Sequence, residues 1–220
     1  MNRLNFNRVS IRTLKSSALA IALGAASFGA FAGGEGALYG PQAPKGSSFV
    51  RAYNAGSGEL SVSVGNATLN DITPQGSSDF KFLPPGNYTA KVGSQSLPVK
   101  LDPDAYYTLV SQPGGEPRLV PEPPFKNKQK ALVRVQNLSG KALTLKTADG
   151  KTEVVSNVAP QSHGDREINP VKVNLALFDG AKKVSDLKPV TLERGEVVCL
   201  YVTGDSKLNP VWVKRPVKAD

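Results

Sequence analysis

The sequence has very few of the side chains that carry acid–base, metal or redox chemistry. Its 220 residues include one histidine, one cysteine, one tryptophan and one methionine. One histidine and one cysteine cannot supply the usual ligand set of a zinc site, and a lone cysteine excludes an intramolecular disulfide. We therefore expect neither a metal nor a cofactor.

Long amphipathic segments are missing as well. Beyond the first 32 residues, no stretch of about 12 residues keeps the 3.6-residue apolar period of a helix. Instead, 21 glycines and 17 prolines help to separate short runs of Val, Leu, Thr and Tyr. This pattern is typical of strands joined by turns. We predict an all-β protein with almost no helix.

The amino terminus is basic and then apolar. Four basic residues between positions 3 and 15 precede an apolar run that ends in Ala30-Phe31-Ala32. This is the pattern of a secretory signal peptide with a small-x-small cleavage site. The run is too short, and too rich in Ala and Gly, for the roughly 20 apolar residues of a membrane-spanning helix. We expect residues 1–32 to be removed by cleavage after Ala32, which leaves an exported protein.

The remaining sequence contains an internal repeat. Three pairs of segments correspond in the same order: SFVRAYNAGSGELSVSVGN (48–66) with ALVRVQNLSGKALTLKTAD (131–149), ITPQGSSDFKF (72–82) with VAPQSHGDREI (158–168), and YYTLVS (106–111) with VCLYVT (198–203). Each copy reads as six or seven short strands, which is typical of a small β-sandwich.

The pattern within one segment predicts how its side chains are buried. In NPVKVNLALFDG, apolar and other residues alternate: Val171, Val173, Leu175 and Leu177 against Lys172, Asn174 and Ala176. A period of two is expected for a strand with one buried face and one solvent-exposed face. We predict one continuous half-buried strand here.

These patterns predict two tandem β-sandwich domains, Ig-like or jelly-roll-like and antiparallel. The N-terminal domain covers 33–113 and the C-terminal domain 131–220, with a short Pro- and Lys-rich linker at 114–130. Because Pro-rich segments are semi-rigid spacers, we expect a limited range of domain orientations.

Charge is shared unevenly between the halves. Removing four basic residues with the signal peptide lowers the formal net charge from +9 to +5. Residues 33–120 hold six basic and seven acidic residues (net −1), and residues 121–220 hold seventeen and eleven (net +6). An anionic partner would meet the second half first. Nucleic acid is disfavoured because the lysines lie among acids without stacking aromatics.

Gly204-Asp205-Ser206 follows a short apolar strand, as in the nucleophile block of SGNH esterases and acetyltransferases. Such an enzyme needs a histidine to accept the serine proton and an aspartate to orient it. No histidine follows Ser206, and the single histidine, His163, lies upstream. We interpret this motif as a loop after a strand and predict that the chain is not an enzyme.

Cys199 is the other candidate nucleophile. Its setting, EVVCLYV, is that of a small buried apolar side chain. A reactive thiol is the alternative, but no neighbouring histidine or basic residue would lower the thiol pKa.

Several long strings resemble the AlgF family of periplasmic accessory proteins in alginate O-acetylation: GALYGPQAPKGSSFVR, GSQSLPVKL, EPPFKNKQKALVRVQNLS, LTLKTADGKTEVV and EINPVKVNLALFDGAKKVSDLKPVTLERGE. The resemblance covers residues 34–215. It implies a periplasmic protein of two β-sandwich modules that is needed to acetylate mannuronate residues of alginate. It further implies a non-catalytic adaptor that links a membrane-bound O-acetyltransferase to SGNH-type acetyltransferases.

Three functional hypotheses follow. The first is the adaptor, a monomer by itself. The second is a polyuronate-binding module that holds alginate near the acetyltransferases, although Tyr39, Tyr53 and Trp212 are too dispersed to predict a sugar-stacking platform. The third is an acyl-carrying enzyme that uses Ser206 or Cys199. The candidate contacts with a partner or polyanion are Lys126, Lys128, Lys130, Tyr106, Tyr107, Trp212, Lys214 and Arg215.

Overall fold

The computed structural model describes residues 42–204 and 206–215. The predicted signal peptide and its cleavage position after Ala32 lie outside these residues. Every regular element in the described part is a β-strand, which confirms the all-β prediction. None of the described segments is a helix long and apolar enough to cross a membrane. From Ala43 onward the described chain belongs to one compact unit.

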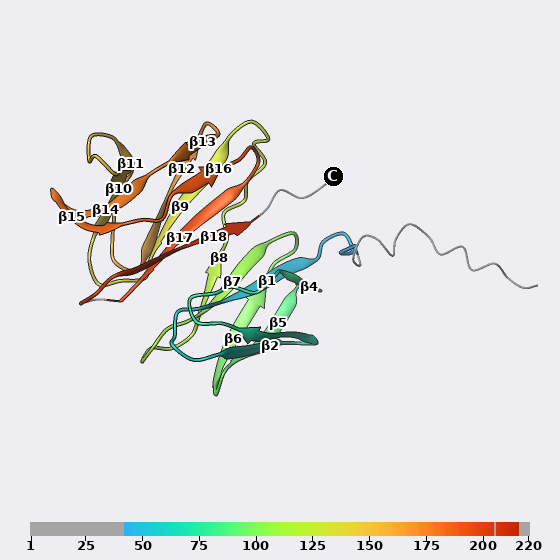
Figure 1. Ribbon diagram of the computed structural model, residues 1–220. Helices are drawn as coiled ribbons and strands as arrows, with labels where there is room; N and C mark the ends of the chain where they lie inside the picture. The colour runs from blue at the N-terminus through green and yellow to red at the C-terminus, as the bar shows by residue number, and fades with distance from the viewer. Residues whose placement is uncertain (1–41, 205, 216–220) are drawn as a thin grey trace, which may run out of the picture. The chain divides into compact units, whose positions relative to one another are not determined.

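The first repeat folds into two four-stranded sheets (Figure 1), which we call the N-terminal module. Its strands are β1 (Ser48–Asn54), β2 (Leu60–Val64), β3 (Ala67–Ile72), β4 (Lys81–Leu83), β5 (Gly86–Val92), β6 (Gln95–Leu101), β7 (Tyr106–Ser111) and β8 (Arg118–Pro121).

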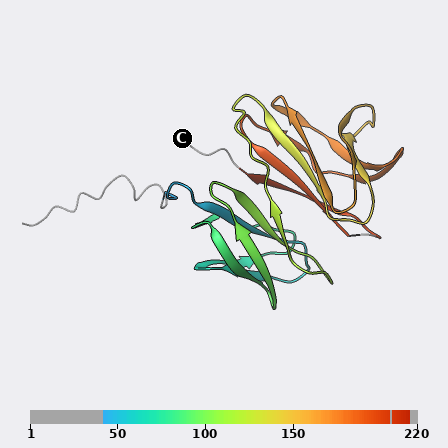
Figure 2. The same cartoon turned by 180° about the vertical axis from the view of Figure 1, so that it is seen from behind.

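The second repeat forms the C-terminal module, drawn from yellow to red in Figures 1 and 2. Its strands are β9 (Ala131–Asn137), β10 (Leu143–Thr147), β11 (Glu153–Val158), β12 (Ser162–Ile168), β13 (Val171–Val173), β14 (Leu175–Asp179), β15 (Lys182–Asp186), β16 (Val190–Leu192), β17 (Val197–Thr203) and β18 (Asn209–Arg215).

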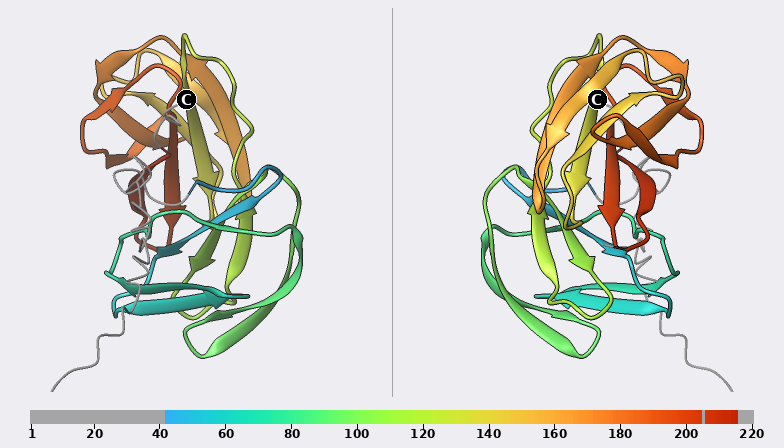
Figure 3. Two further views of the ribbon diagram at one scale, coloured as in Figure 1. Left: turned by 90° about the vertical axis from the view of Figure 1, so that its right-hand side faces the viewer. Right: turned by 90° about the vertical axis from the view of Figure 1, so that its left-hand side faces the viewer.

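The two modules have the same topology. The sheet orders β4-β1-β7-β8 and β3-β2-β5-β6 in the first correspond to β12-β9-β17-β18 and β11-β10-β14-β15 in the second. The C-terminal module adds the two-stranded sheet β13-β16. Eight strands of each module have an equivalent in the other module, and these eight strands are divided equally between two sheets. Figure 3 shows the ribbon from two further sides.

Each module contains one parallel strand pair among antiparallel ones. β1 runs parallel to β7, with Val50 opposite Tyr107, and β9 runs parallel to β17, with Val133 opposite Val198. The first strand of each repeat thus pairs with a strand that comes much later, which closes the module on itself.

A repeated asparagine supports each module in the same way. Asn54 donates through Nδ2 to the carbonyl oxygen of Ile72 at 2.9 Å, and Asn137 donates through Nδ2 to that of Val158 at 3.0 Å. Both side chains also bond within the turn that follows their own strand. Because these are buried carbonyls, losing the donor would leave them unpaired.

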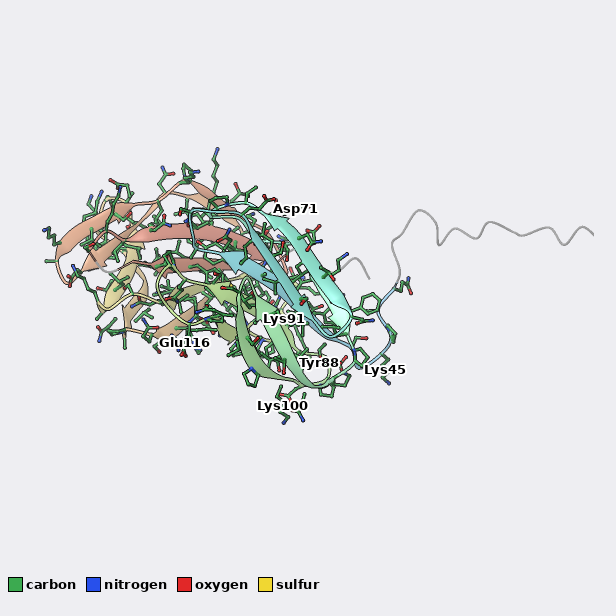
Figure 4. All side chains as sticks on the ribbon, turned by 90° about the horizontal axis from the view of Figure 1, so that it is seen from below. Lys45, Asp71, Tyr88, Lys91, Lys100 and Glu116 are labelled. Carbon is green, nitrogen blue, oxygen red and sulfur yellow. The ribbon has the colours of Figure 1, made fainter. Side chains whose placement is uncertain are left out.

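Two apolar cores fill the modules. The N-terminal core includes Val50, Ala52, Leu83 and Leu109, and the C-terminal core is built around residues such as Leu145, Leu177 and Leu200. The outer sheet of the N-terminal module keeps the period of two, since Thr89 and Lys91 are exposed and Ala90 and Val92 are buried. Lys91 and Lys100, on β5 and β6, are labelled in Figure 4.

The prediction of one strand in NPVKVNLALFDG is wrong. The segment forms two strands, β13 and β14, which belong to different sheets. Val171 is 44 % exposed, whereas Ala176 is fully buried in a run from Leu175 to Phe178. Both faces of β14 are covered, so the alternation between buried and exposed side chains ends where the chain passes from β13 to β14.

Candidate functional site at the interface between the modules

The outward faces of two sheets pack against each other. Alternate residues of β1, β7 and β8 meet alternate residues of β9, β17 and β18 in a third apolar cluster. Its buried members are Tyr53, Ala55, Val110, Val120, Leu132, Leu138, Val197, Cys199, Tyr201 and Val213. β9 and β17 are therefore buried on both faces. Tyr53 stacks on Tyr201 with ring centroids 4.9 Å apart.

Two equivalent arginines bridge the modules reciprocally. Arg51 on β1 donates from its terminal nitrogen Nη1 to the carbonyl oxygen of Lys214 on β18 at 2.7 Å. Arg134 on β9 donates from Nη1 to the carbonyl oxygen of Pro121 on β8 at 2.9 Å. The strand registers place Pro121 opposite Tyr107 and Lys214 opposite Val198. Tyr107 and Val198 lie opposite the equivalent residues Val50 and Val133, one residue from the alignment of YYTLVS with VCLYVT, so the two acceptors occupy equivalent positions.

Two equivalent glutamines make a second reciprocal contact. Gln75 and Gln161 both have positive φ, 60° and 58°. Each donates its side-chain amide to carbonyl groups of its own module, and each accepts a hydrogen bond from the other module. The donors are Asn209 to Gln75 and Arg118 to Gln161. The two glutamines are thus equivalent, whereas their donors come from corresponding strands, β8 and β18, but from positions two residues apart.

A buried carboxylate lies at the centre of the interface. Oε1 of Glu122 accepts hydrogen bonds from Arg51 and Thr108, both at 2.6 Å, and from the hydroxyl of Tyr201 at 3.3 Å. Oε2 accepts from the thiol of Cys199 at 3.4 Å and lies 3.9 Å from Nη1 of Arg215. The side chains of Arg51 and Glu122 are 2 % and 1 % exposed. We call this group the Glu122 cluster.

The Glu122 cluster controls the ionisation of its members. Burial alone would raise the pKa of Glu122, but Arg51, Thr108 and Arg215 outweigh it and hold the pKa below its ordinary value. Burial, aided by Glu122, raises the pKa of the Cys199 thiol and of the Tyr201 phenol well above their usual values. The cluster therefore holds an ionised carboxylate next to a neutral thiol.

Aromatic rings border the Glu122 cluster. Phe49 stacks on Tyr106 with centroids 4.4 Å apart, and Phe80 meets Tyr106 edge to face at 5.2 Å. The guanidinium groups of Arg51 and Arg215 lie over the rings of Phe80 and Tyr106 at 4.6 and 4.7 Å. Arg215 comes from β18, so the C-terminal module completes an aromatic group of the N-terminal module.

A cavity opens at the edge of the interface. Its volume is about 300 Å³, and residues of both modules line it, including Ala55, Gln112, Leu138 and Gln161. Among the described residues, no charged side chain lines this cavity. The Nε2 atom of Gln112 is shielded from solvent and has no hydrogen-bond acceptor among the described residues.

The interface brings together only some of the predicted contact residues. Tyr106 and Arg215 meet directly. Tyr107 is 6 % exposed, and its hydroxyl accepts a hydrogen bond from the backbone N–H of Asp102.

The side chains of Trp212 and Lys214, on β18, make contacts within the C-terminal module. The indole N–H of Trp212 donates to the carbonyl of Lys188 at 3.1 Å, and its ring packs against the C-terminal core. Nζ of Lys214 donates to the carbonyl of Thr191 and pairs with Glu196 at 3.0 Å.

The three predicted linker lysines, Lys126, Lys128 and Lys130, are exposed. The segment proposed as linker also contains β8, which pairs with β7. Phe125 packs against the interface cluster, and the carbonyl of Pro123 accepts a hydrogen bond from Arg215. This connection therefore runs along the interface.

The candidate nucleophiles have no catalytic surroundings among the described residues. Ser206 is exposed, and no hydrogen bond joins it to His163, an exposed residue of β12. Gly204 has φ of +83°, and a Cβ there would clash with the carbonyl oxygen of Lys207. The glycine is thus required by a tight turn. In the described ranges no three His, Cys, Asp or Glu residues gather as a metal site.

Comparison with known proteins gives one consistent result. The family described as "Alginate O-acetyl transferase AlgF" matches residues 20–199. The chain belongs to the AlgF family. It is 81 % identical over 204 residues to the alginate biosynthesis protein AlgF of Pseudomonas aeruginosa, covering 92 % of this chain and 94 % of that protein. AlgF of Azotobacter vinelandii is 66 % identical over 188 residues, covering 85 % and 87 %.

Two solved structures are of AlgF domains from P. aeruginosa. The C-terminal domain is 86 % identical, covers 40 % of this chain and 100 % of its own, and gives a TM-score of 0.38. The N-terminal domain is 79 % identical, covers 37 % and 100 %, and gives a TM-score of 0.34.

Proposed function

We propose that this AlgF-family chain is a non-catalytic periplasmic adaptor required to acetylate mannuronate residues of alginate. In this role it links a membrane-bound O-acetyltransferase to SGNH-type acetyltransferases. Export by the predicted signal peptide would bring the chain to those partners. The relatives' name, alginate biosynthesis protein, supports the pathway. The family description names an O-acetyl transferase, whereas the adaptor role rests on the residues themselves.

The observation that carries the proposal is the packing between the modules. A flexible tether would let two bound enzymes drift, because the distance between modules would follow the linker. Here Arg51 and Arg134 each donate to a backbone carbonyl group of the other module. Glu122 also accepts buried hydrogen bonds from Cys199 and Tyr201 of the C-terminal module. Partners bound to different modules would be held at one distance, which raises the effective concentration of one beside the other.

The described residues form no catalytic constellation around Ser206 or Cys199, which supports the same proposal. Acyl transfer by a serine or cysteine needs a base within hydrogen-bond reach of the nucleophile. Ser206 has no such contact with His163 among the described residues, and the Cys199 thiol donates to a carboxylate in a buried interface. Neither side chain is placed to attack an acetyl donor.

The polyuronate-binding alternative is less well supported. Sugar stacking needs an exposed aromatic face, but Tyr53 is fully buried under Tyr201. Trp212 is packed partly against the C-terminal core, and Tyr39 lies outside the described residues. The main support for polyuronate binding is the set of exposed lysines on the C-terminal module. Scattered surface charge is weak support for a specific site.

Sequential affinity capture tests the adaptor proposal. The chain would carry one tag and a periplasmic acetyltransferase of an alginate-producing host a second. After capture on both tags, the membrane-bound acetyltransferase should be present by immunoblot. In cells that lack this chain, capture on the tag of the periplasmic acetyltransferase alone should no longer recover the membrane-bound acetyltransferase. Recovery of the two acetyltransferases together without the chain would contradict the proposal.

A further inference from the structure

The module interface has the organisation of a two-fold dimer contact. In such a contact, residue i of one partner meets residue j of the other, and j meets i. Arg51 and Arg134 occupy equivalent positions and reach equivalent carbonyl groups, those of Lys214 and Pro121. The same strands, β1, β7 and β8 or β9, β17 and β18, provide the face on each side.

The residues nearest the pseudo-two-fold axis differ in charge. Glu122 directly follows Pro121, and Arg215 directly follows Lys214, so these two residues are also equivalent. Equivalent residues meet each other only close to the axis of a two-fold contact. Glu122 and Arg215 do so, with 3.9 Å between Oε2 and Nη1.

We propose that a second copy of this chain also fits each of these faces. The N-terminal module of one copy then pairs with the C-terminal module of the other. The Glu122 and Arg215 charges confine pairing to unlike modules. This inference rests on the interface alone and does not depend on the adaptor role.

Main-chain acceptors make the faces interchangeable between copies. The acceptors of Arg51 and Arg134 are backbone carbonyls, which every copy of the chain presents in the same place. The stacked pair Tyr53 and Tyr201 would likewise form again across two chains. An exchanged pair would therefore contain every contact of the closed chain, with the exception of those in the connection between the modules.

Pairs of like modules lack the charge complementarity. Two C-terminal modules would bring two Arg215 side chains together with no carboxylate in the place of Glu122. Two N-terminal modules would bring two Glu122 carboxylates together, each with its own Arg51 but without Arg215. A buried charge without a counter-charge is strongly unfavourable, which disfavours the pair of C-terminal modules. The pair of N-terminal modules keeps its Glu122–Arg51 ion pairs but brings two carboxylates together, and like charges repel.

The connection between the modules keeps the intact chain closed. Only the residues between Pro123, held by Arg215, and β9 separate the two faces. A short connection gives the module of the same chain a high effective concentration. Cutting the connection removes this advantage and leaves the faces free to exchange.

A cleavable full-length chain tests the proposal. A protease site is inserted after exposed Lys126, and the folded protein is prepared with natural and with ¹⁵N-enriched nitrogen. Both forms are cut, mixed and followed by native mass spectrometry. We expect the halves to stay paired and to exchange into N·C pairs of mixed label. Separation of the halves after cutting, or N·N and C·C pairs as abundant as N·C pairs, would refute the proposal.

A charge variant tests the selection separately. Arg215→Met keeps an apolar stem of similar length and removes the repulsion between two C-terminal modules, so C·C pairs should appear after cutting. Lys182→Met removes an exposed charge from β15 and should leave only N·C pairs. C·C pairs that stay absent in Arg215→Met would show that Arg215 does not select the partner.

Discussion

Replacing Glu122 by alanine should strongly destabilise the module interface. The change removes the carboxylate that pairs with Arg51 at 2.6 Å and leaves that guanidinium buried without a counter-charge. It also removes the acceptor for Thr108 and Tyr201. Breaking a buried ion pair from one side costs about 3–5 kcal/mol. At about 2–4 °C per kcal/mol for a chain of this size, we expect a fall in Tm of about 6–20 °C.

Differential scanning calorimetry measures this effect, and two further variants serve as controls. Asp186→Ala removes an exposed ion pair with Lys183, and a pair of this kind is worth at most about 1 kcal/mol. The double variant Arg51→Met with Glu122→Met removes both charges of the ion pair and should recover part of the loss, because apolar pairs can replace buried ion pairs, while Arg215 still lacks its nearby carboxylate. A Tm for Glu122→Ala within 2 °C of the Asp186→Ala value would refute the reasoning, since ~1 kcal/mol corresponds to at least that shift.

The same measurement across pH tests the ionisation of Glu122. Its pKa is lower in the folded protein than the ordinary value of 4.5. The ionised form therefore stabilises the fold above about pH 4.5, and this contribution is lost as pH falls through the folded-state pKa. The Tm difference between the natural chain and Glu122→Gln should be constant near neutral pH and shrink in acid. A difference that grows in acid would contradict the assignment.

Three other predictions concern buried groups. Cys199 should resist a thiol reagent until the modules part, because burial raises the pKa of its thiol; rapid labelling of the native chain would place the thiol at the surface. Burial raises the pKa of Tyr53 to about 12, so this phenol favours the fold below its ordinary pKa of 10.0 and stability should fall as pH rises from 10 towards 12. Absorbance at 295 nm together with circular dichroism follows this, and complete tyrosine ionisation before unfolding would oppose it. Asn54→Ala and Asn137→Ala should each cost about 1–3 kcal/mol in urea unfolding, because each leaves buried carbonyls unpaired; a cost below 0.5 kcal/mol for both would show that the equivalent bonds are unimportant.

The repeat and the fold class follow from local patterns in the sequence. Turn residues and short apolar runs recur in the same order in both halves, and the two modules share one topology. The division of NPVKVNLALFDG into β13 and β14 could not be predicted, because the sequence keeps an apolar residue at every second position across the break at Asn174. Only the sheets on either side of the break distinguish the two strands.

The interface itself depends on distant residues. Arg51 and Glu122 are 71 positions apart in sequence, and no local pattern connects them. One signal was present: ALVRVQN and EVVCLYV carry apolar residues on both faces, as is expected for strands covered on both sides. The equivalent arginines, Arg51 and Arg134, were visible in the repeat, but their reciprocal contacts depend on the packing of the modules.

Successive side chains of a strand point to opposite faces of the sheet, and this decides the different surroundings of Tyr106 and Tyr107. Tyr106 points to the face that meets Arg215, whereas Tyr107 points into the N-terminal core. The sequence YYTLVS shows that one of them is buried but does not show which. Register with β1 settles this, because Tyr107 lies opposite Val50, a core residue.

Acetyl transfer by the isolated chain tests the central claim most directly. The purified protein without its signal peptide would be incubated with an activated acetyl ester and polymannuronate oligosaccharides, and both components analysed by mass spectrometry. The account predicts no acetylated sugar and no acetyl adduct on Ser206 or Cys199. Transfer of acetyl groups to the sugar by this chain alone would contradict it.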